Sequence, residues 1–320
     1  MNRDQGSGCE DVSSCLSIII VTYNTRSVTV ACIDSVLKYS RGLDGSLQIV
    51  VIDNGSSDGT RDAVLKKNPK IDYIYNTENS GFSKAVNQGI NASRGEILAF
   101  LNSDTLLQSG IFPDIIRFFR NNPATGIMGG KIVFPDGSIQ LSAWKFPNLS
   151  RELVQRVFIY RVAYRVQRFR KYKSGFQNPV ATDWVTGAFF VCRKKVFDDI
   201  GLFDENFFMY YEDTDLCKRA KNKGWEIVFN PNISLVHYDA LSRKKEPGRI
   251  YLEARKSQIY YYEKHLGAFQ ANVLKKVVWL FMKINILKCL GLQLFKDEKE
   301  MFAGSISTFE SVLREVSKKR

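Results

Sequence analysis

The chain has 320 residues, of which 44% are hydrophobic and 25% are charged, a composition typical of a globular protein with a substantial core. It excludes a disordered chain, a collagen-like repeat and a small disulfide scaffold. The net charge is +13, yet residues 1–150 contain 14 Lys or Arg and 14 Asp or Glu, so the whole excess lies beyond them. A basic surface can face nucleic acid, anionic lipid or polyphosphate ligands, and charge alone does not choose among these partners.

The six cysteines form no C-x-x-C pair and no spacing typical of a zinc site, which favours a reduced, cytoplasmic protein. Residues 1–16 form a polar N-terminal tail. The apolar run that follows is too short for a signal sequence or a membrane span.

Short β-rich runs alternate with helical patterns over the first 135 residues, which predicts a largely parallel sheet covered on both faces. The predicted strands are Ser17–Thr22, Gln48–Asp53, Asp72–Asn76, Ile97–Asn102 and Ile127–Phe134. The predicted helices are Ser27–Tyr39, Asp58–Lys67, Phe82–Ala92 and Gly110–Asn121. Such a fold binds ligands at the carboxyl ends of its strands.

The rhythm changes after a predicted hairpin turn at Asp136 and Gly137. A basic amphipathic insertion is expected at about 150–178, after which the core resumes. Its predicted elements are a strand over 183–192, helices over 196–200 and 212–223, and strands over 226–229 and 234–237. Residues 17–240 are therefore expected to form one α/β domain, and 241–320 a basic helical region with helices over 249–265, 269–291 and 298–317.

Polar residues follow the first two predicted strands. Thr22, Tyr23 and Asn24 end the first, and Asp53 ends the second. Neither strand leads into G-x-G-x-x-G, and no P-loop is present, so dinucleotide binding and P-loop phosphate transfer lose their usual support. The Asp53 carboxylate could accept a hydrogen bond from a pyrimidine ring N–H, or it could serve the turn, as Asp58 is expected to cap the next helix.

Two further segments suit a nucleotide diphosphate. A turn with Asn79, Gly81 and Phe82 opens a helix whose free N–H groups can face an anion, and Asn87 lies within that helix. The fourth strand ends in Asn102, Ser103 and Asp104. One carboxylate beside a diphosphate suits Mg²⁺ or Mn²⁺, because hard cations prefer oxygen ligands.

The acidic run from Glu212 to Asp215 follows a series of aromatic residues and opens a predicted helix. Acids in a first turn complement the helix dipole, and Asp215 is assigned mainly to that role. Three acids exceed what capping requires, so the run is also a candidate for general-base chemistry. Trp184, Thr186, Gly187 and Ala188 are expected to face the same pocket as Glu212, although a plain core strand would also explain them.

Taken together, these segments resemble the family 2 glycosyltransferases, in particular the bacterial rhamnosyltransferase-like branch with the GT-A fold. The similar segments occur in the family's order over about 220 residues. They are Ser17–Asn24, Val50–Thr60, Asn79–Gly89, Gly95–Asp104, Asp183–Ala188 and Phe207–Arg219.

The resemblance implies a mixed, mostly parallel sheet between helices and a set of site residues. Thr22, Tyr23 and Asp53 would hold the base and ribose, and Asp213 would be the catalytic base. Asp104 stands at the last position of the family's D-x-D metal motif, whose first position is Asn102 here. Related transferases place a metal-binding imidazole at the position of His237, although a core histidine bonded to backbone would fit equally well. His265 is expected to be a helix-end residue.

The predicted function is inverting, metal-dependent transfer of rhamnose or another hexose from a dTDP- or UDP-sugar. The acceptor would be a hydroxyl of a bacterial surface glycan, which a polyprenyl diphosphate could carry. The basic second half could hold the enzyme on the inner face of the plasma membrane, or be a solvated face, and the C-terminal helices could form a homodimer. The alternatives are a nucleic-acid or polyanion-binding protein, which the acidic run disfavours, and an inactive glycan-binding scaffold.

Overall fold

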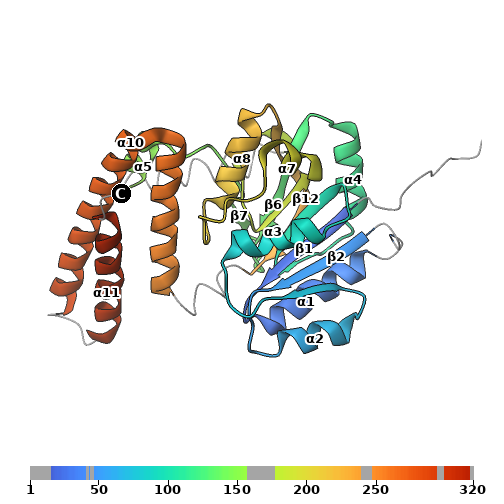
Figure 1. The fold of residues 1–320 in the computed structure, drawn as a ribbon, viewed down its shortest axis with the longest axis horizontal. Helices are drawn as coiled ribbons and strands as arrows, with labels where there is room; N and C mark the ends of the chain where they lie inside the picture. Colours follow the sequence, from blue (N-terminus) through green and yellow to red (C-terminus); the bar gives the residue numbers. More distant parts are fainter. Residues whose placement is uncertain are drawn as a thin grey trace, which may run out of the picture.

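The computed structural model describes residues 16–40, 43, 47–156, 177–238, 247–293 and 299–317. A mixed sheet with helices on both faces forms the larger part of the molecule, and the C-terminal helices stand beside it (Figure 1). Residues 1–15 of the predicted polar tail and 157–176 of the predicted insertion lie outside the described residues, and Leu16 already belongs to the first strand.

The sheet is mixed and mostly parallel, as predicted. Its main strands, in spatial order, are β3 (Asp72–Tyr75), β2 (Leu47–Asp53), β1 (Leu16–Thr22), β4 (Ile97–Asn102), β11 (Phe189–Arg193), β6 (Thr125–Val133), β12 (Glu226–His237) and β5 (Thr105–Leu106). The first four are parallel, and β11 runs antiparallel between β4 and β6. This order brings the carboxyl ends of β1, β2 and β4 to one edge.

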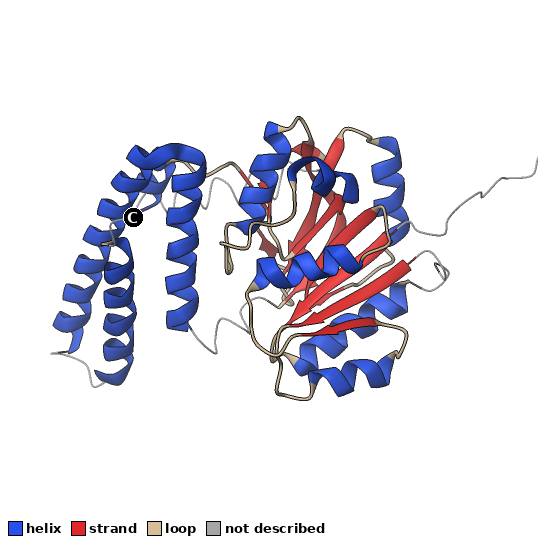
Figure 2. Ribbon diagram, viewed as in Figure 1, coloured by secondary structure: helices blue, strands red, loops and turns tan. Residues whose placement is uncertain are grey.

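Helices cover both faces of the sheet (Figure 2). One hydrophobic core packs beneath α1 (Arg26–Tyr39), α2 (Thr60–Lys67) and α4 (Phe112–Asn121). The other packs beneath α3 (Phe82–Ala92), α7 (Lys194–Ile200) and α8 (Glu212–Asn222). Because both faces are buried, the central strands are almost continuously apolar in sequence.

Asp58 holds the starts of two helices. One of its carboxylate oxygens accepts the N–H of Arg26, the first residue of α1, at 2.9 Å, and the other accepts the N–H of Thr60 at 3.2 Å. Asp58 thus accepts the first N–H of both helices from outside them, although the N-cap residue of α2 is Gly59 and not Asp58. The predicted helix begins two residues later than expected, since Gly59 adopts φ +78 before Thr60.

Several short strands escape the sequence pattern. The single strand expected over 183–192 is divided into β10 (Trp184–Val185) and β11, while the two expected over 226–237 form one bulged strand, β12. β10 pairs with β8 (Ala143–Trp144) in a separate ribbon. The remaining short strands are β7 (Ile139–Gln140), which pairs with β6, and β9 (Val180–Ala181), which pairs with β12.

The C-terminal helices form a third hydrophobic core. α10 (Pro247–Gln293) merges two predicted helices and breaks at Gly267, where φ is +85. Its two parts pack with each other and with α11 (Lys299–Val316), and Phe207 and Tyr211 from the α/β part join this core. α5 (Leu149–Arg156) also contacts α10. The helical region is therefore packed onto the loop that precedes α8.

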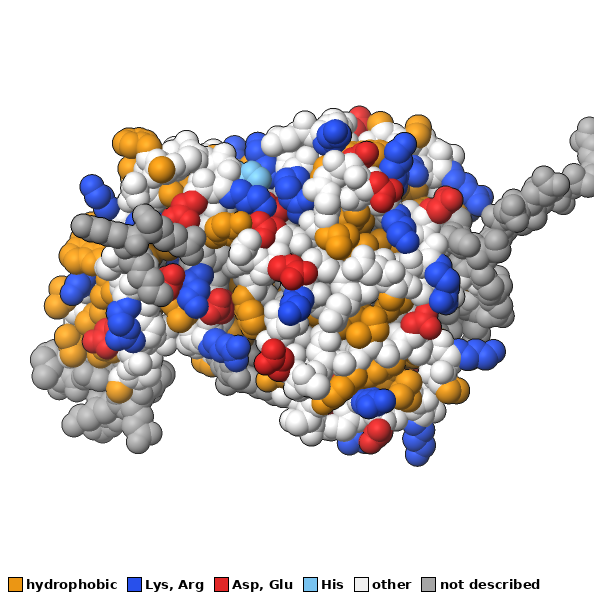
Figure 3. Space-filling view, viewed as in Figure 1, with side chains coloured by type: hydrophobic (Ala, Val, Ile, Leu, Met, Phe, Trp, Pro, Cys, Tyr) orange, Lys and Arg blue, Asp and Glu red, His pale blue; other side chains and the backbone are white. Residues whose placement is uncertain are grey.

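Large apolar side chains remain exposed on the second part of α10, among them Leu280, Leu287 and Leu290 at 52%, 67% and 47% exposure. Figure 3 shows hydrophobic side chains on the outer edge of the C-terminal helices, with Lys and Arg side chains between them. No helix in the described part of the chain is long and apolar enough to span a bilayer.

Candidate active site

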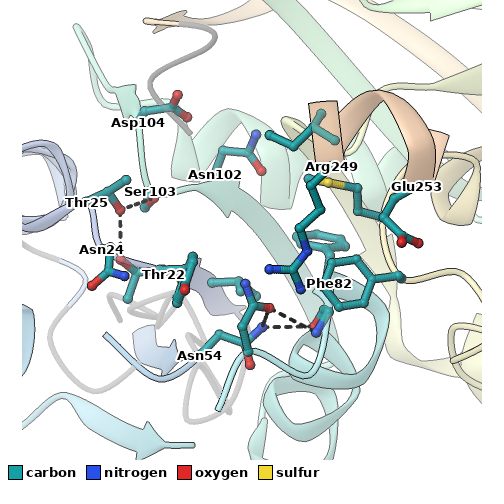
Figure 4. Close-up of a pocket in the computed structure, with 17 residues that line it drawn as sticks. Thr22, Asn24, Thr25, Asn54, Phe82, Asn102, Ser103, Asp104, Arg249 and Glu253 are labelled. Atoms are coloured by element: carbon teal, nitrogen blue, oxygen red, sulfur yellow. Dashed lines mark hydrogen bonds between the residues drawn. The ribbon is translucent and has the colours of Figure 1, made fainter. Parts of the chain in front are cut away.

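A pocket of about 240 Å³ opens at the carboxyl ends of β1 and β4 (Figure 4). Predicted residues line much of it: Thr22, Tyr23, Asn24, Asn79, Gly81, Phe82, Asn102, Ser103 and Asp104. Sequence reasoning missed the other lining residues, which are Val21, Thr25, Asn54, Phe208, Met209, Arg249, Ile250 and Glu253. The topology thus gathers the strand-end residues at one opening, as a parallel sheet requires.

Hydroxyl groups organise the floor of this pocket. Thr22 Oγ1 lies 3.0 Å from Thr25 Oγ1 and 2.8 Å from Thr29 Oγ1. Thr25 Oγ1 in turn lies 3.1 Å from Ser103 Oγ, so this chain of hydroxyls joins the ends of β1 and β4. Asn24 adopts φ +51, a region that asparagine tolerates better than most residues, and its side chain accepts the N–H of Ser57 at 2.8 Å.

Asn54 fixes the loop that carries Asn79 and Gly81. Its amide nitrogen donates to Asn79 Oδ1 at 2.9 Å and to the Gly81 carbonyl at 3.1 Å, and its oxygen accepts the Ser80 N–H at 3.2 Å. The side chain is 3% exposed, so it sits behind the loop as a support. The sequence feature that could have identified Asn54 as a site residue is its position directly after the predicted strand end at Asp53.

Gly81 allows the loop to approach Phe208 closely. A Cβ on Gly81 would lie 2.8 Å from the Phe208 carbonyl oxygen and from its ring, and Gly81 has φ +90. The same carbonyl accepts the N–H of Phe82, the first residue of α3, at 2.7 Å. The Phe208 loop is thereby attached to the wall of the pocket.

Two predicted nucleotide-binding residues lie outside the pocket lining. Asp53 is fully buried, and its two oxygens accept the Ser56 N–H at 2.7 Å and the Tyr73 hydroxyl at 2.5 Å. Burial, together with the bond to Asp53, raises the pKa of Tyr73 above its ordinary value. Asp53 therefore shapes the turn after β2 from behind, and its contact with the base stays a prediction.

Asn87 is the second such residue. Its amide donates to the Phe203 carbonyl at 2.9 Å and to Glu205 at 3.0 Å, and its oxygen accepts the Phe203 N–H at 3.0 Å. The side-chain amide of Asn87 thus holds the segment before α8 against α3. The residue is polar within an amphipathic helix because it satisfies buried backbone groups.

Asp104, in the turn between β4 and β5, and His237, at the end of β12, come together as predicted. His237 Nε2 lies 3.1 Å from Asp104 Oδ1, and Nδ1 lies 2.8 Å from Gln140 Oε1. Neighbouring ligands of one octahedral Mg²⁺, each about 2.1 Å from the ion, stand about 3 Å apart, so the pair fits a shared divalent cation. Within the described residues no group of three or more His, Cys, Asp or Glu side chains is arranged to hold a metal ion, so phosphate or water oxygens would complete such a site.

The acidic run opens α8 on a strained turn. Tyr210 and Tyr211 adopt φ +66 and +67, a left-handed conformation that is rare for such bulky residues. Asp213 Oδ2 accepts the Gly187 N–H at 2.8 Å, and Oδ1 accepts the Thr214 N–H at 2.6 Å. The turn thus holds the Asp213 carboxylate in a fixed orientation against Gly187.

Glu212 and Asp213 are adjacent and poorly solvated. Glu212 is 7% exposed, and its Oε2 has no hydrogen-bond partner among the described residues. Burial, and then the charge of Asp213, raise the pKa of Glu212 well above its ordinary value. Burial also raises the pKa of Asp213, although the hydrogen bonds from Gly187 and Thr214 oppose this change. A carboxylate with a raised pKa is a better proton acceptor than an ordinary one.

Two backbone contacts relate Asp213 to the pocket. The Asn102 N–H donates to the Ala188 carbonyl at 3.0 Å, and the neighbouring residue, Gly187, binds Asp213. Asp213 does not itself line the pocket around Asp104. It is connected through Gly187 and Ala188 to Asn102, the last residue of β4, and Asn102 does line the pocket. Trp184, from the same segment, stacks on Trp144 at 6.0 Å between ring centroids, and the Thr186 N–H donates to the Ser142 carbonyl at 3.0 Å.

Asp215 is more than a helix-dipole residue, which corrects the sequence interpretation. It is fully buried, with Arg219 at 2.8 Å, Lys264 at 2.8 Å and His265 at 2.7 Å. Burial alone would raise the pKa of Asp215, but the bond from His265 and the charges of Arg219 and Lys264 hold it below its ordinary value. His265 does lie near a helix end, just before the break at Gly267, but it has a further role because it joins α10 to α8.

A pocket at parallel strand ends, beside an Asp–His pair and a carboxylate turn, is typical of the ligand sites of α/β enzymes. The chain belongs to glycosyl transferase family 2, whose model matches residues 17–201. It is a glycosyltransferase of the rhamnosyltransferase-like kind.

Two relatives indicate the branch. The chain is 28% identical over 276 residues to the N-acetylglucosaminyl-diphospho-decaprenol L-rhamnosyltransferase of Mycobacterium tuberculosis, which covers 80% of this chain and 87% of that protein. It is 23% identical over 241 residues to the O-antigen biosynthesis protein RfbC of Myxococcus xanthus, covering 72% of this chain and 18% of that one.

Solved structures establish the GT-A fold. The mannosyltransferase PcManGT from Pyrobaculum calidifontis, solved with GDP-Man and Mn²⁺, matches with a TM-score of 0.57 at 14% identity, over 97% of this chain and 90% of that one. GalNAc-T7, solved with UDP, GalNAc and Mn²⁺, matches with a TM-score of 0.51 at 14% identity, over 71% of this chain and 44% of that one. The predicted fold, including the C-terminal helical extension, is confirmed.

Proposed function

We propose that this glycosyltransferase moves rhamnose or a related hexose from a dTDP- or UDP-sugar to a hydroxyl of a lipid-linked bacterial glycan, with inversion at C1. The fixed orientation of Asp213 against Gly187, next to the strand end that carries Asn102, is the observation that carries this proposal. The name of the mycobacterial relative supports a prenyl-diphosphate-linked N-acetylglucosamine as the class of acceptor.

Asp213 is the general base in this mechanism. Its carboxylate takes the proton of the acceptor hydroxyl while the oxygen attacks C1 of the donor sugar. The new C1–O bond forms as the bond between C1 and the diphosphate oxygen breaks, and the nucleoside diphosphate leaves with its electron pair. Gly187 contacts the base, Trp184, Thr186 and Ala188 belong to the same segment, and the Trp184–Trp144 pair offers apolar ring surface to a sugar.

Asp104 and His237 would hold a divalent metal, Mn²⁺ or Mg²⁺. When bound, the ion supplies positive charge to the departing diphosphate. Gln140 Oε1 accepts a hydrogen bond from Nδ1 of His237 and so fixes the ring orientation that leaves Nε2 beside Asp104. Removal of the metal with EDTA should abolish transfer, and Mn²⁺ should restore it; full activity in EDTA would contradict the metal proposal.

A thermal-shift series with nucleotide sugars, each with and without Mn²⁺, tests the donor. A ligand that binds the folded state raises the midpoint, so dTDP-rhamnose or a UDP-hexose should shift it and GDP-mannose should not. Transfer to a prenyl-diphosphate N-acetylglucosamine should then give a product whose anomeric configuration, read by NMR, is inverted. A retained configuration would contradict Asp213 as the base of a single displacement.

We also propose that the enzyme works at the cytoplasmic membrane surface, where such an acceptor is found. The support is one face of α10, here called the α10 outer face, which repeats at helical spacing. Its residues are Lys276, Trp279, Leu280, Lys283, Ile284, Leu287, Lys288 and Leu290. Apolar side chains with lysines between them suit an anionic lipid surface.

Flotation with vesicles tests this surface. Phosphatidylglycerol vesicles should retain the protein and phosphatidylcholine vesicles should not. Lys283→Gln should weaken retention about fivefold, since one lysine near an anionic surface contributes about 1 kcal/mol. Lys66→Gln, an exposed lysine on α2, is the matched control. Equal retention on both kinds of vesicle would contradict the proposal.

A further inference from the structure

The first turns of α10 form one wall of the donor pocket. Arg249, Ile250 and Glu253 line it together with strand-end residues more than 140 positions earlier in the chain. The family model ends at residue 201, so its match does not include this wall. The C-terminal helical region is therefore part of the site.

Charge makes Arg249 distinctive within this lining. Among the described lining residues it is the one cationic side chain, while Asp104 and Glu253 are acidic. Glu253 is already paired with Lys256 at 2.8 Å. A nucleoside diphosphate brings at least two negative charges into the pocket, and a single divalent ion cannot satisfy every phosphate oxygen. The planar guanidinium group suits such oxygens better than any other side chain.

The pocket also positions Arg249. Its guanidinium carbon lies 5.4 Å from the centre of the Phe208 ring. Phe208 is held in turn by the contact with Gly81 and by the hydrogen bond from the Phe82 N–H. Figure 4 shows Arg249 reaching from α10 into the pocket, toward Asn54 and Phe82 and below Asn102. The guanidinium is thus fixed by the same loop that shapes the nucleotide site.

We infer that Arg249 is a donor-binding residue that contacts the diphosphate of the nucleotide sugar. This inference rests on the proposed function, because it needs a nucleoside diphosphate in the pocket. It assigns the C-terminal helical region a second role, in which α10 supplies a cation on the side of the donor opposite Thr22. The Asp215–His265 contact fixes α10 against α8, so the cation and the base belong to one packed unit.

Binding measurements can separate contact with the diphosphate from a purely structural role. Affinities for UDP and dTDP with Mn²⁺ are measured by calorimetry, and those for uridine and thymidine by ligand-observed NMR. Arg249→Gln should weaken UDP or dTDP binding by about 10- to 100-fold and nucleoside binding by less than about twofold, because a nucleoside lacks the charged group. Arg249→Lys should recover part of the loss, and Arg120→Gln, which changes an exposed arginine on α4 outside the pocket, should change neither.

Two results would overturn the inference while leaving the proposed function intact. Unchanged UDP and dTDP affinity in Arg249→Gln would show that the guanidinium does not meet the donor, even if the acceptor KM rose. Equal losses for nucleoside and diphosphate would show that Arg249 only supports the pocket wall. Failure of the unaltered protein to bind either diphosphate would remove the proposed donor, and the inference with it.

Discussion

The two halves of the site are built on opposite electrostatic principles. At the nucleotide half, neutral groups hydrogen-bond to one another: the hydroxyl chain from Thr22 to Ser103 and the amide of Asn54 behind its loop. At the α8 half, acids are packed together with little solvent, and Glu212 and Asp213 have raised pKa values. Hydrogen bonds between neutral groups fix the shape of the nucleotide half, whereas the α8 half brings acidic side chains close together.

This difference predicts two kinds of response to substitution. Changes at the nucleotide half should act through geometry, with similar effects at any pH. Changes at the α8 half should act through charge and depend on pH, because burial makes an uncompensated charge expensive.

The largest effect is expected from Asp213→Asn, which removes the proposed base while keeping the side-chain volume. kcat should fall by about 100- to 10,000-fold, the range that general-base catalysis supplies, with donor affinity nearly unchanged. Steady-state kinetics and calorimetry check both quantities. Asp114→Asn, an exposed acid on α4, is the control, and a residual rate within tenfold of the unaltered enzyme would reject Asp213 as the base.

Asp215→Asn should damage stability more than any other change at the α8 half. It leaves Arg219, Lys264 and His265 without their buried counter-charge, at a cost of about 3 to 5 kcal/mol in the free energy of unfolding. Asp114 and Arg117 also form an Asp–Arg pair within one helix, but their side chains are 56% and 71% exposed. Asp114→Asn should therefore cost less than about 0.5 kcal/mol in urea titrations.

The same comparison carries a pH dependence. The pKa of Asp215 is held below its ordinary value, so its stabilising contribution is complete above the unfolded pKa and is lost as pH falls through the folded one. Asp204, bonded to Lys264, has its pKa lowered to about 2 and acts in the same direction. Stability of the unaltered protein should thus fall below about pH 4, and more steeply than that of Asp215→Asn. Parallel curves would contradict this account.

At the nucleotide half, Gly81→Ala tests shape alone. The new methyl group would meet Phe208 at 2.8 Å, in a backbone conformation with φ +90 and ψ 166 that favours glycine. Gly201 has nearly the same conformation, φ +76 and ψ 172, with nothing within 4 Å of an added Cβ. Both alanine variants should lose about 1 to 3 kcal/mol from backbone strain.

Only Gly81→Ala should lose a further 1 to 3 kcal/mol, roughly, and bind UDP more weakly, because the overlap with Phe208 is absent at Gly201. Thermal unfolding and calorimetry on the two variants provide the measurement. Equal losses in both would mean that the Phe208 loop moves away easily.

Local pattern identified the strand-end residues that line the first half of the site. Strand alternation places Thr22 and Asn102 at strand ends, and a parallel sheet must bring those ends together. Asp104 and His237 were predicted together only through resemblance, since β12 lies far along the chain from β4. Asn54 could have been noticed as a polar residue after the strand, but the residues that its side chain contacts could not.

The second half depended on contacts that no local pattern encodes. An acid in the first turn of a helix, such as Asp215, can either complement the helix dipole or form the centre of a buried network. Only the position of α10 distinguishes these two roles. In the sequence, Asn87 resembles an amide that binds a ligand. In the structure, its side chain hydrogen-bonds to the backbone of Phe203 instead. Arg249 carries no motif, and its place in the pocket follows from the packing of Phe207 and Tyr211 with the C-terminal helices.

The smallest effect is expected from Glu212→Gln. Burial and the neighbouring Asp213 raise the pKa of the Glu212 carboxyl well above its ordinary value, which favours its neutral form, and a neutral amide of the same shape replaces it. kcat/KM should change less than about threefold near neutral pH, and it should fall with decreasing pH as Asp213 takes up its proton. The acidic limb of the profile should stay in place or move to lower pH, because the substitution removes any negative charge beside Asp213, and such a charge raises the pKa of a neighbouring acid. A loss as large as that of Asp213→Asn would instead assign the proton transfer to Glu212, and the two carboxylates would exchange roles.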